Sequence, residues 1–144
     1  MNQDPKPHER HDFDWAKACR QFSLEREFSA LREAVKQTVK VVQDDPPTGA
    51  FPQAFKFEEY GPDERMMFSV LQYVMGNAFR GVHFTLVSGG IIADSSSTSG
   101  VETSRKLTVY MTEAGEFRYQ IDGKGSYLRW QVVRGVLGEM LGLA

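Results

Sequence analysis

The stretch KLTVYMTEAGEFRYQID, residues 106 to 122, decides the fold. Apolar and polar residues alternate on both sides of Glu113-Ala114-Gly115, as in two adjacent antiparallel strands. If these three residues form the turn, with Gly115 in the left-handed conformation, every apolar residue faces an apolar partner. The apolar pairs are Leu107 with Ile121, Val109 with Tyr119, and Met111 with Phe117. The pairs on the other face are Lys106 with Asp122, Thr108 with Gln120, and Tyr110 with Arg118.

A different turn length would destroy this pattern. A two-residue or four-residue loop shifts the pairing by one residue and sets Thr112 against Phe117, which mixes the two faces along the whole ladder. The sequence therefore predicts a hairpin of strands 105–112 and 116–122, with its six apolar residues in the core.

Length and composition place the chain among single-domain proteins. Its 144 residues are close to the commonest domain size, and its 41% apolar and 25% charged residues are near the globular average. No apolar run approaches the roughly 20 residues that cross a bilayer, and the polar N-terminus lacks the apolar segment of a signal peptide. We expect a flexible polar tail at 1–12, a single α+β domain at 13–144, no membrane partner and a cytoplasmic location.

Helical spacing extends from Asp14 to Gln43, but the apolar face changes at Ser23. Such a change predicts two helices, 14–22 and 24–43, the second one capped by the Ser23 hydroxyl. The pair Pro46-Pro47 ends the second helix, because proline cannot continue the hydrogen-bond ladder.

The segment 62–80 is the most ambiguous one. It starts like a helix, with Pro62 at the first position followed by two acids, and its polar residues recur every three or four positions. These polar residues are Arg65, Ser69, Gln72, Gly76 and Arg80. The spacing favours a mostly buried helix with one solvated stripe. The alternative, with Gly61 to Glu64 as a turn between two strands, stays open.

Further strands are predicted at 81–88 and 91–94, joined by a tight turn at Gly89-Gly90, and a strand at 54–59 is left open. The serine- and threonine-rich segment 94–104 is predicted to be a mobile loop. The chain should end in a helix at 126–141, with a strand at 127–133 as the alternative. The expected fold is an α+β domain in which an antiparallel sheet of about four or five strands is packed by four helices.

The predicted last helix has an unusual distribution of glycines. Its apolar side carries Trp130, Val133, Val136, Leu137, Met140 and Leu141, and its other side carries Gly135, Gly138 and Gly142. Such a smooth side would let another backbone approach closely; a frayed terminal helix is the equal alternative. The candidate binding residues of the chain are Lys106, Tyr110, Arg118, Arg129, Trp130, Arg134, Gly135 and Gly138.

No established catalytic or metal-binding motif is present. The chain lacks a phosphate-cradling glycine loop, a G-x-S-x-G elbow, an H-E-x-x-H helix and a C-x-x-C pair. His8 and His11 have no third metal ligand at a defined spacing, and Cys19 is typical of a small buried side chain. We therefore expect no cofactor and no metal site, and His83 is the one candidate base outside the tail.

Because the sequence shows no catalytic or metal-binding motif, it favours a non-enzymatic protein-binding module, such as a small accessory, inhibitor or adaptor protein. It would act through a sheet edge, the last helix or both, on another protein or on a second copy of itself. One alternative is a nucleic-acid-binding protein that uses the basic and aromatic hairpin face, although a net charge of −2 disfavours it. A second alternative is a small enzyme with a site centred on His83.

Overall fold

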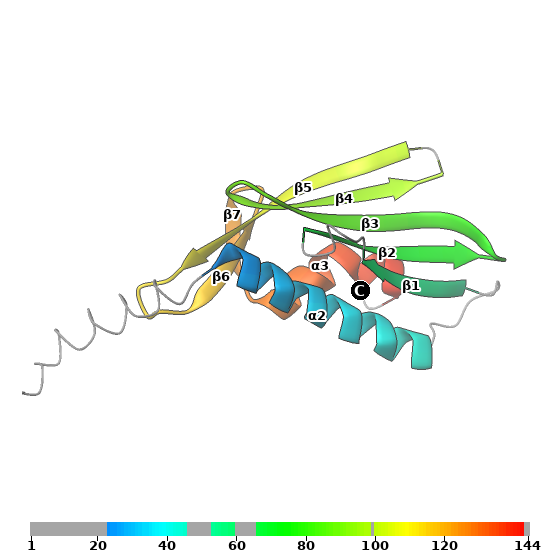
Figure 1. The fold of residues 1–144 in the computed structure, drawn as a ribbon, viewed down its shortest axis with the longest axis horizontal. Helices are drawn as coiled ribbons and strands as arrows, with labels where there is room; N and C mark the ends of the chain where they lie inside the picture. Colours follow the sequence, from blue (N-terminus) through cyan, green and yellow to red (C-terminus); the bar gives the residue numbers. More distant parts are fainter. Residues whose placement is uncertain (1–22, 46–52, 60–65, 99, 143–144) are drawn as a thin grey trace, which may run out of the picture.

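The structure, a computed structural model, describes residues 23–45, 53–59, 66–98 and 100–142. Within these ranges the chain forms one seven-stranded antiparallel sheet and two helices, α2 and α3 (Figure 1). The strands are β1 (Gln53–Glu59), β2 (Met67–Val74), β3 (Asn77–Val87), β4 (Gly90–Ser97), β5 (Gly100–Met111), β6 (Phe117–Ile121) and β7 (Lys124–Tyr127). The helices are α2 (Leu24–Asp44) and α3 (Arg129–Leu141). The α+β class is as predicted, but the sheet has more strands than the expected four or five.

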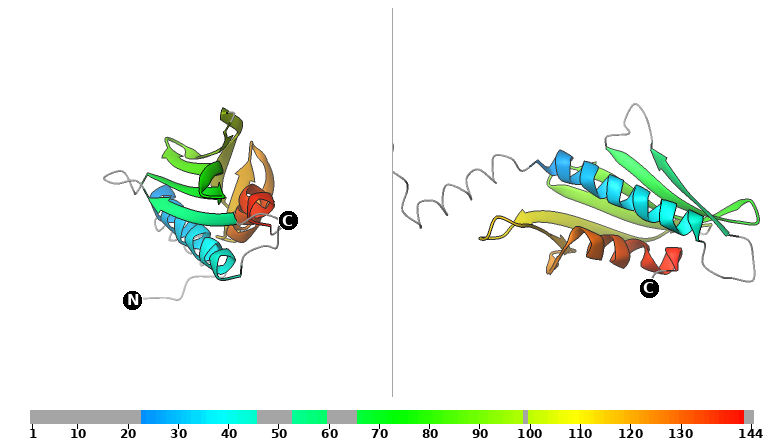
Figure 2. Two further views of the ribbon diagram at one scale, coloured as in Figure 1. Left: turned by 90° about the vertical axis from the view of Figure 1, so that its right-hand side faces the viewer. Right: turned by 90° about the horizontal axis from the view of Figure 1, so that it is seen from below.

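Each strand pairs with the next one along the chain, so the spatial order of the strands is their sequence order. The two helices lie side by side on one face of this sheet (Figure 2). The core lies between the helices and the sheet, and Phe68 and Phe84 stack within it with ring centroids 4.7 Å apart. Fully burying a side chain of this size contributes about 1.5–3 kcal/mol, which makes this layer the main source of stability.

Helix α2 confirms the predicted helix at 24–43. The hydroxyl of Ser23 accepts a hydrogen bond from the backbone N–H of Arg26 at 3.4 Å. Its buried apolar residues recur at three- and four-residue spacing; they are Phe28, Leu31, Val35, Val39 and Val42. The predicted tail 1–12, the predicted helix 14–22 and the Pro46-Pro47 end signal lie outside the described residues.

The β5–β6 hairpin has the predicted register. Leu107 pairs with Ile121, Val109 with Tyr119, Tyr110 with Arg118 and Met111 with Phe117. The turn is closed by Thr112 N–H donating to the Glu116 carbonyl at 2.8 Å, and Gly115 has φ of 80°. Of the six residues assigned to the core, Leu107 and Tyr119 are fully buried, whereas the other four are half-buried.

The predicted helix at 62–80 is wrong. Its described part forms β2, a turn at Met75 and Gly76, and the start of β3. The supposed solvated stripe is not solvated, because Ser69 and Gln72 are buried. Their polar atoms find partners across the sheet: Ser69 Oγ lies 2.6 Å from His83 Nδ1, and Gln72 Oε1 accepts from Arg80 Nε at 2.5 Å. The two-strand alternative is confirmed for β1 and β2, which pair antiparallel, although residues 60–65 between them are not described.

The predicted loop at 94–104 is also wrong, because β4 and β5 extend through it. Asp94 pairs with Ser104 and Ser95 with Thr103. Strand β4 hydrogen-bonds to β3 on one side and β5 on the other, so the ladder holds this segment despite its polar composition. The predicted turn also shifts by one residue: Val87 pairs with Gly90, which leaves Ser88 and Gly89 as the turn.

The predicted C-terminal helix is confirmed, whereas the alternative strand at 127–133 is wrong, because residues 129–133 belong to α3. A short strand, β7, precedes the helix, and α3 begins at Arg129, three residues after the predicted start at Ser126. The Gln131 side chain fixes this start, since its Oε1 accepts from the Leu128 N–H at 2.8 Å.

Candidate functional site

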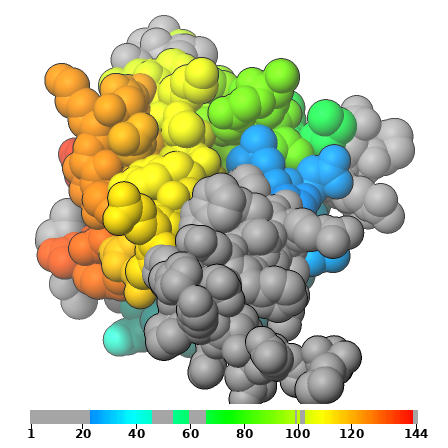
Figure 3. Space-filling model, turned by 90° about the vertical axis from the view of Figure 1, so that its left-hand side faces the viewer, coloured from blue at the N-terminus to red at the C-terminus, as the bar shows by residue number. Residues whose placement is uncertain are grey.

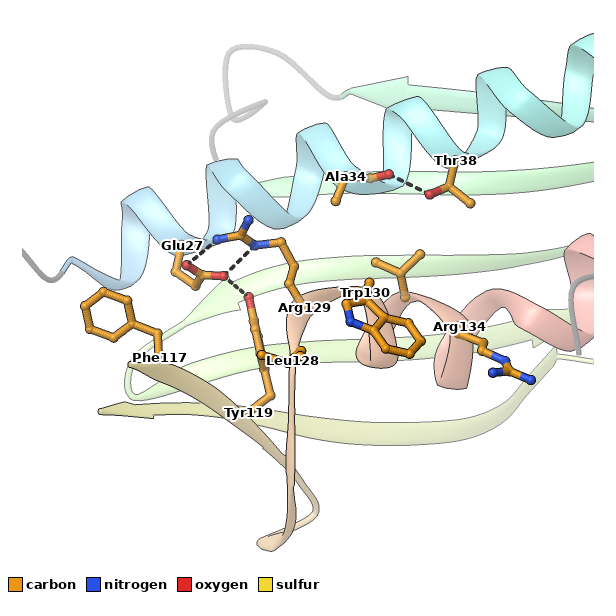
Figure 4. A pocket seen from close by; sticks show the side chains of 10 residues that line it. Glu27, Ala34, Thr38, Phe117, Tyr119, Leu128, Arg129, Trp130 and Arg134 are labelled. Carbon is orange, nitrogen blue, oxygen red and sulfur yellow. Dashed lines mark hydrogen bonds and ion pairs between the residues drawn. The ribbon is translucent and has the colours of Figure 1, made fainter. Parts of the chain in front are cut away.

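A groove of about 560 Å³ lies between α2, α3 and β6 (Figure 4). We call it the α2–α3 groove, and most of its lining is aliphatic or aromatic. Helix α2 contributes Glu27, Ala34 and Thr38, β6 contributes Phe117 and Tyr119, and the remaining lining residues are Leu128, Arg129, Trp130, Val133 and Arg134.

Three side chains form a hydrogen-bonded network in one wall of the groove. Glu27 is only 7% exposed, and its Oε1 accepts from the Tyr119 hydroxyl at 2.5 Å and from Arg129 Nε at 2.8 Å. Its Oε2 accepts from Arg129 Nη2 at 3.0 Å, which makes the arginine pair bidentate. The network therefore ties α2 to β6 and α3 at one point.

The protonation states in this network are well defined. Burial, together with the hydrogen bond to Glu27, raises the pKa of the Tyr119 phenol above its ordinary value. The hydrogen bonds to Glu27 raise the pKa of Arg129. Tyr119 is thus neutral and Arg129 charged near neutral pH, and the buried carboxylate is satisfied by three donors. This arrangement fixes the shape of the wall.

Two side chains on α3 lie at the rim of the groove. Trp130 is 58% exposed, although it is one of the largest apolar residues in the chain. Arg134 is exposed and, within the described ranges, makes no ion pair. Figure 4 shows both side chains beside the groove on α3. The rim therefore offers an exposed aromatic surface and a positive charge that no described carboxylate compensates.

The faces of α3 differ from the prediction. Its buried residues are Val132, Val133, Leu137, Gly138, Met140 and Leu141. Trp130 lies off this buried face and Gly138 lies on it, while Gly135 is exposed. The three glycines consequently do not form one smooth side. Gly142 instead ends the helix in the left-handed conformation, with φ of 71°.

The structure brings Arg129, Trp130 and Arg134 together and separates them from the hairpin candidates. Lys106, Tyr110 and Arg118 alternate along their strands with the buried Leu107 and Tyr119, so they lie on the opposite face of the sheet. The hairpin (yellow) and β7 (orange) adjoin each other at one end of the molecule (Figure 3).

Two of the three hairpin side chains already have partners. The Tyr110 hydroxyl donates to Ser126 Oγ at 2.8 Å, and Arg118 Nη2 lies 2.8 Å from Glu116 Oε2. Beside Lys106, the Asp122 carboxylate accepts from the Lys106 backbone N–H at 2.9 Å. Carboxylates therefore lie among the cations of this face, which weakens its attraction for phosphates.

His83 lies in a row of polar side chains across the sheet. Its Nδ1 is 2.6 Å from Ser69 Oγ, and its Nε2 is 3.2 Å from Ser96 Oγ. Ser69 is fully buried, so its hydroxyl does not face solvent. A substrate would have to displace one of these hydrogen bonds to reach the imidazole. The geometry is that of cross-strand hydrogen bonding.

Sequence reasoning missed Glu27 and Tyr119 as parts of a site. The alternation of the hairpin predicts Tyr119 only as a core residue, and the sequence patterns give Glu27 no role in a site. One signal was present: Glu27 stands three residues after Leu24 and four before Leu31, on the apolar side of α2. A carboxylate at such a position requires a buried partner.

Comparisons with known proteins found no matching family model, curated protein or solved structure. In the described part of the chain, neither helix is long and apolar enough to cross a membrane. The same residues contain no group of three histidine, cysteine, aspartate or glutamate side chains that could hold a metal ion. His8, His11 and Cys19 lie outside the described residues. Function is therefore inferred from the chemistry of the α2–α3 groove.

Proposed function

We propose that this protein is a non-enzymatic, cytoplasmic protein-binding module whose α2–α3 groove receives an acidic, apolar segment of another protein. The observation that supports the proposal is the exposed Trp130 next to Arg134, which makes no ion pair with any residue that the structure describes, at the rim of an apolar groove. Tryptophan and arginine are the residues most enriched among those that dominate the binding energy of protein interfaces.

The lining defines the apolar part of the partner. Phe117, Leu128, Trp130 and Val133 offer a surface for a large side chain such as leucine or phenylalanine. Burial of one such side chain contributes about 1.5–3 kcal/mol. A partner with one or two of these residues would be anchored in the groove.

Charge defines the polar part of the partner. Arg129 and Arg134 contribute two positive charges to the lining and Glu27 contributes one negative charge, which leaves a net charge of +1. The charge of Arg129 is compensated by Glu27, so Arg134 is the cation of the lining that has no ion-pair partner among the described residues. A segment with an aspartate or glutamate beside its apolar anchor complements this arrangement.

The wall that faces the partner is already ordered. Because Glu27 accepts hydrogen bonds from both Tyr119 and Arg129, these side chains are already positioned before a partner binds. A preformed wall reduces the entropic cost of association, which is about 0.5–1.5 kcal/mol for each side chain that must be immobilised.

A peptide selection tests the proposal. Random short peptides are selected on the wild-type chain, and the enriched peptides are then assayed on a Trp130→Ala/Arg134→Gln double variant. We expect enriched peptides that carry an aspartate or glutamate beside a large apolar residue. Trp130→Ala should weaken their binding by at least about tenfold. The control Phe79→Ala removes another exposed aromatic side chain, 46% exposed and outside the groove, and should not change the affinity.

Two outcomes would overturn the proposal. One is a set of peptides that bind the wild type and the double variant equally well. The other is failure of every peptide, combined with tight binding of a medium-chain fatty acid, since a groove of this volume also suits a small apolar carboxylate.

A further inference from the structure

A second cavity, of about 220 Å³, lies between α3 and strands β3, β4 and β5. We call it the β3–β5 cavity. Unlike the α2–α3 groove, it is lined by many polar side chains, among them Arg80, Ser95, Thr103, Arg105 and Glu139. We propose that this cavity binds the phosphate group of a small phosphorylated molecule.

The strand register places the hydroxyl groups between the two arginines. Ser95 on β4 pairs with Thr103 on β5, so their side chains are neighbours on the same face of the sheet. Strands β3 and β5 run in the same direction, because both are antiparallel to β4. On β3, Arg80 lies two residues before Val82, the residue that pairs with Ser95. On β5, Arg105 lies two residues after Thr103. The cationic side chains thus approach the hydroxyl pair from opposite ends.

Arg80 is held in place by a buried residue. Its Nε donates to Oε1 of Gln72, a side chain only 2% exposed. This bond uses Nε, and among the described residues no hydrogen bond involves the terminal nitrogens, which can therefore contact a ligand. Arginine binds phosphate through paired N–H groups, and hydroxyls such as those of Ser95 and Thr103 can donate to the remaining oxygens.

The charges in the cavity favour an anion. Arg80 and Arg105 contribute two positive charges and Glu139 one negative charge, a net charge of +1. Throughout the described ranges, neither arginine lies within ion-pair distance of a carboxylate. Glu139 belongs to the helix wall, so the phosphate would lie nearer the sheet wall.

Gly135 leaves the helix wall open. It lies four residues before Glu139 on α3, and a Cβ atom added to it would meet nothing within 4 Å. A larger side chain can be accommodated at this exposed lining position, and we expect it to obstruct the cavity. The phosphate site can therefore be blocked without disturbing the core, because leucine favours a helix more than glycine does.

The experiment is a chemical-shift titration of the full-length ¹⁵N-labelled protein with inorganic phosphate at constant ionic strength. We expect saturable shifts at Ser95, Thr103 and Arg105, and weaker shifts with acetate. Arg105→Gln should weaken phosphate binding by at least about tenfold, the size expected for a lost charge-assisted contact. Gly135→Leu should abolish binding while the spectrum stays folded. Glu139→Gln should tighten binding by removing the like charge.

The matched control is Arg134→Gln, which removes an arginine from the same helix but from the other groove. It should leave phosphate binding unchanged. Shifts that do not saturate, or that respond equally to Arg105→Gln and Arg134→Gln, would overturn the proposal. Unaltered binding in the folded Gly135→Leu variant would also overturn it. None of these outcomes depends on peptide binding in the α2–α3 groove.

Discussion

Glu27 is the residue on which the shape of the α2–α3 groove depends. It is a buried carboxylate whose oxygens accept three hydrogen bonds from Tyr119 and Arg129. Its neighbours along α2 are core residues, so its position there is possible only because the partners arrive from β6 and α3. One side chain thereby joins three elements that are far apart in the sequence.

Replacing Glu27 with alanine should lower the free energy of unfolding by about 2–3 kcal/mol. The reason is that the buried Tyr119 hydroxyl loses its acceptor, while Arg129, whose side chain is 43% exposed, recovers part of its loss through solvation. Urea denaturation measures the effect. Glu33→Ala, at an exposed position on the same helix, is the control and should stay within about 0.5 kcal/mol of the wild type. Equal stability of the two variants would show that the network contributes nothing.

The raised pKa of Tyr119 predicts a loss of stability in alkali. An ordinary tyrosine titrates at 10.0, so above about pH 10 the unfolded chain loses a proton that the folded chain keeps. The free energy of unfolding then falls as pH rises, by up to about 1.4 kcal/mol per pH unit from this group. In Tyr119→Phe this contribution is absent, so the stability difference between wild type and variant should shrink above about pH 10. A difference that is constant between about pH 8 and 11 would contradict the prediction.

At the scale of elements, the β2–β3 turn contains a local conflict between residue type and conformation. Met75 has φ of 52° and Gly76 has φ of 82°, values typical of a two-residue hairpin turn that favours asparagine followed by glycine. The Met75 side chain is 68% exposed, so it gains little packing in return.

Met75→Asn should therefore raise the free energy of unfolding by about 0.5–1 kcal/mol, because asparagine tolerates the left-handed conformation better. Thermal unfolding measures the gain. Met66→Asn is the matched control, since Met66 is also exposed but does not have positive φ. Stabilisation of both variants to the same extent would attribute the effect to polarity and not to the turn.

The elements that could be predicted from sequence are those with local signals. The β5–β6 register follows from alternation and one glycine, and α2 follows from its apolar face and the Ser23 cap. Strand β2 and the first residues of β3 could not be recognised, because Ser69 and Gln72 are buried by neighbours that only the folded sheet supplies. Their partners are His83 and Arg80, which the sequence does not identify. Burial of Ser69 and Gln72 without partners is unfavourable, so the spacing favours a helix at 62–80 that leaves both side chains in solvent.

At the scale of the whole molecule, the candidate site is built by tertiary structure. Tyr119 and Arg129 lie 92 and 102 residues after Glu27, and no sequence spacing indicates that the three meet. The sequence offers Arg129 and Arg134 as cations that follow the hairpin, and Trp130 as part of the apolar side of the last helix. The structure gives them a different role, as lining of a groove against α2. It also shows that the hairpin cations face away from this groove.

The most direct test of the groove as a binding site is the fluorescence of Trp130. The chain has two tryptophans, so a Trp15→Phe variant makes Trp130 the single reporter. Addition of a selected peptide should shift the emission to shorter wavelength and reduce quenching by acrylamide, because the exposed indole leaves water. Arg134→Gln should weaken the affinity seen in this titration, and the control Arg118→Gln, on the opposite face, should not. Peptide binding that leaves the Trp130 emission unchanged would contradict the account.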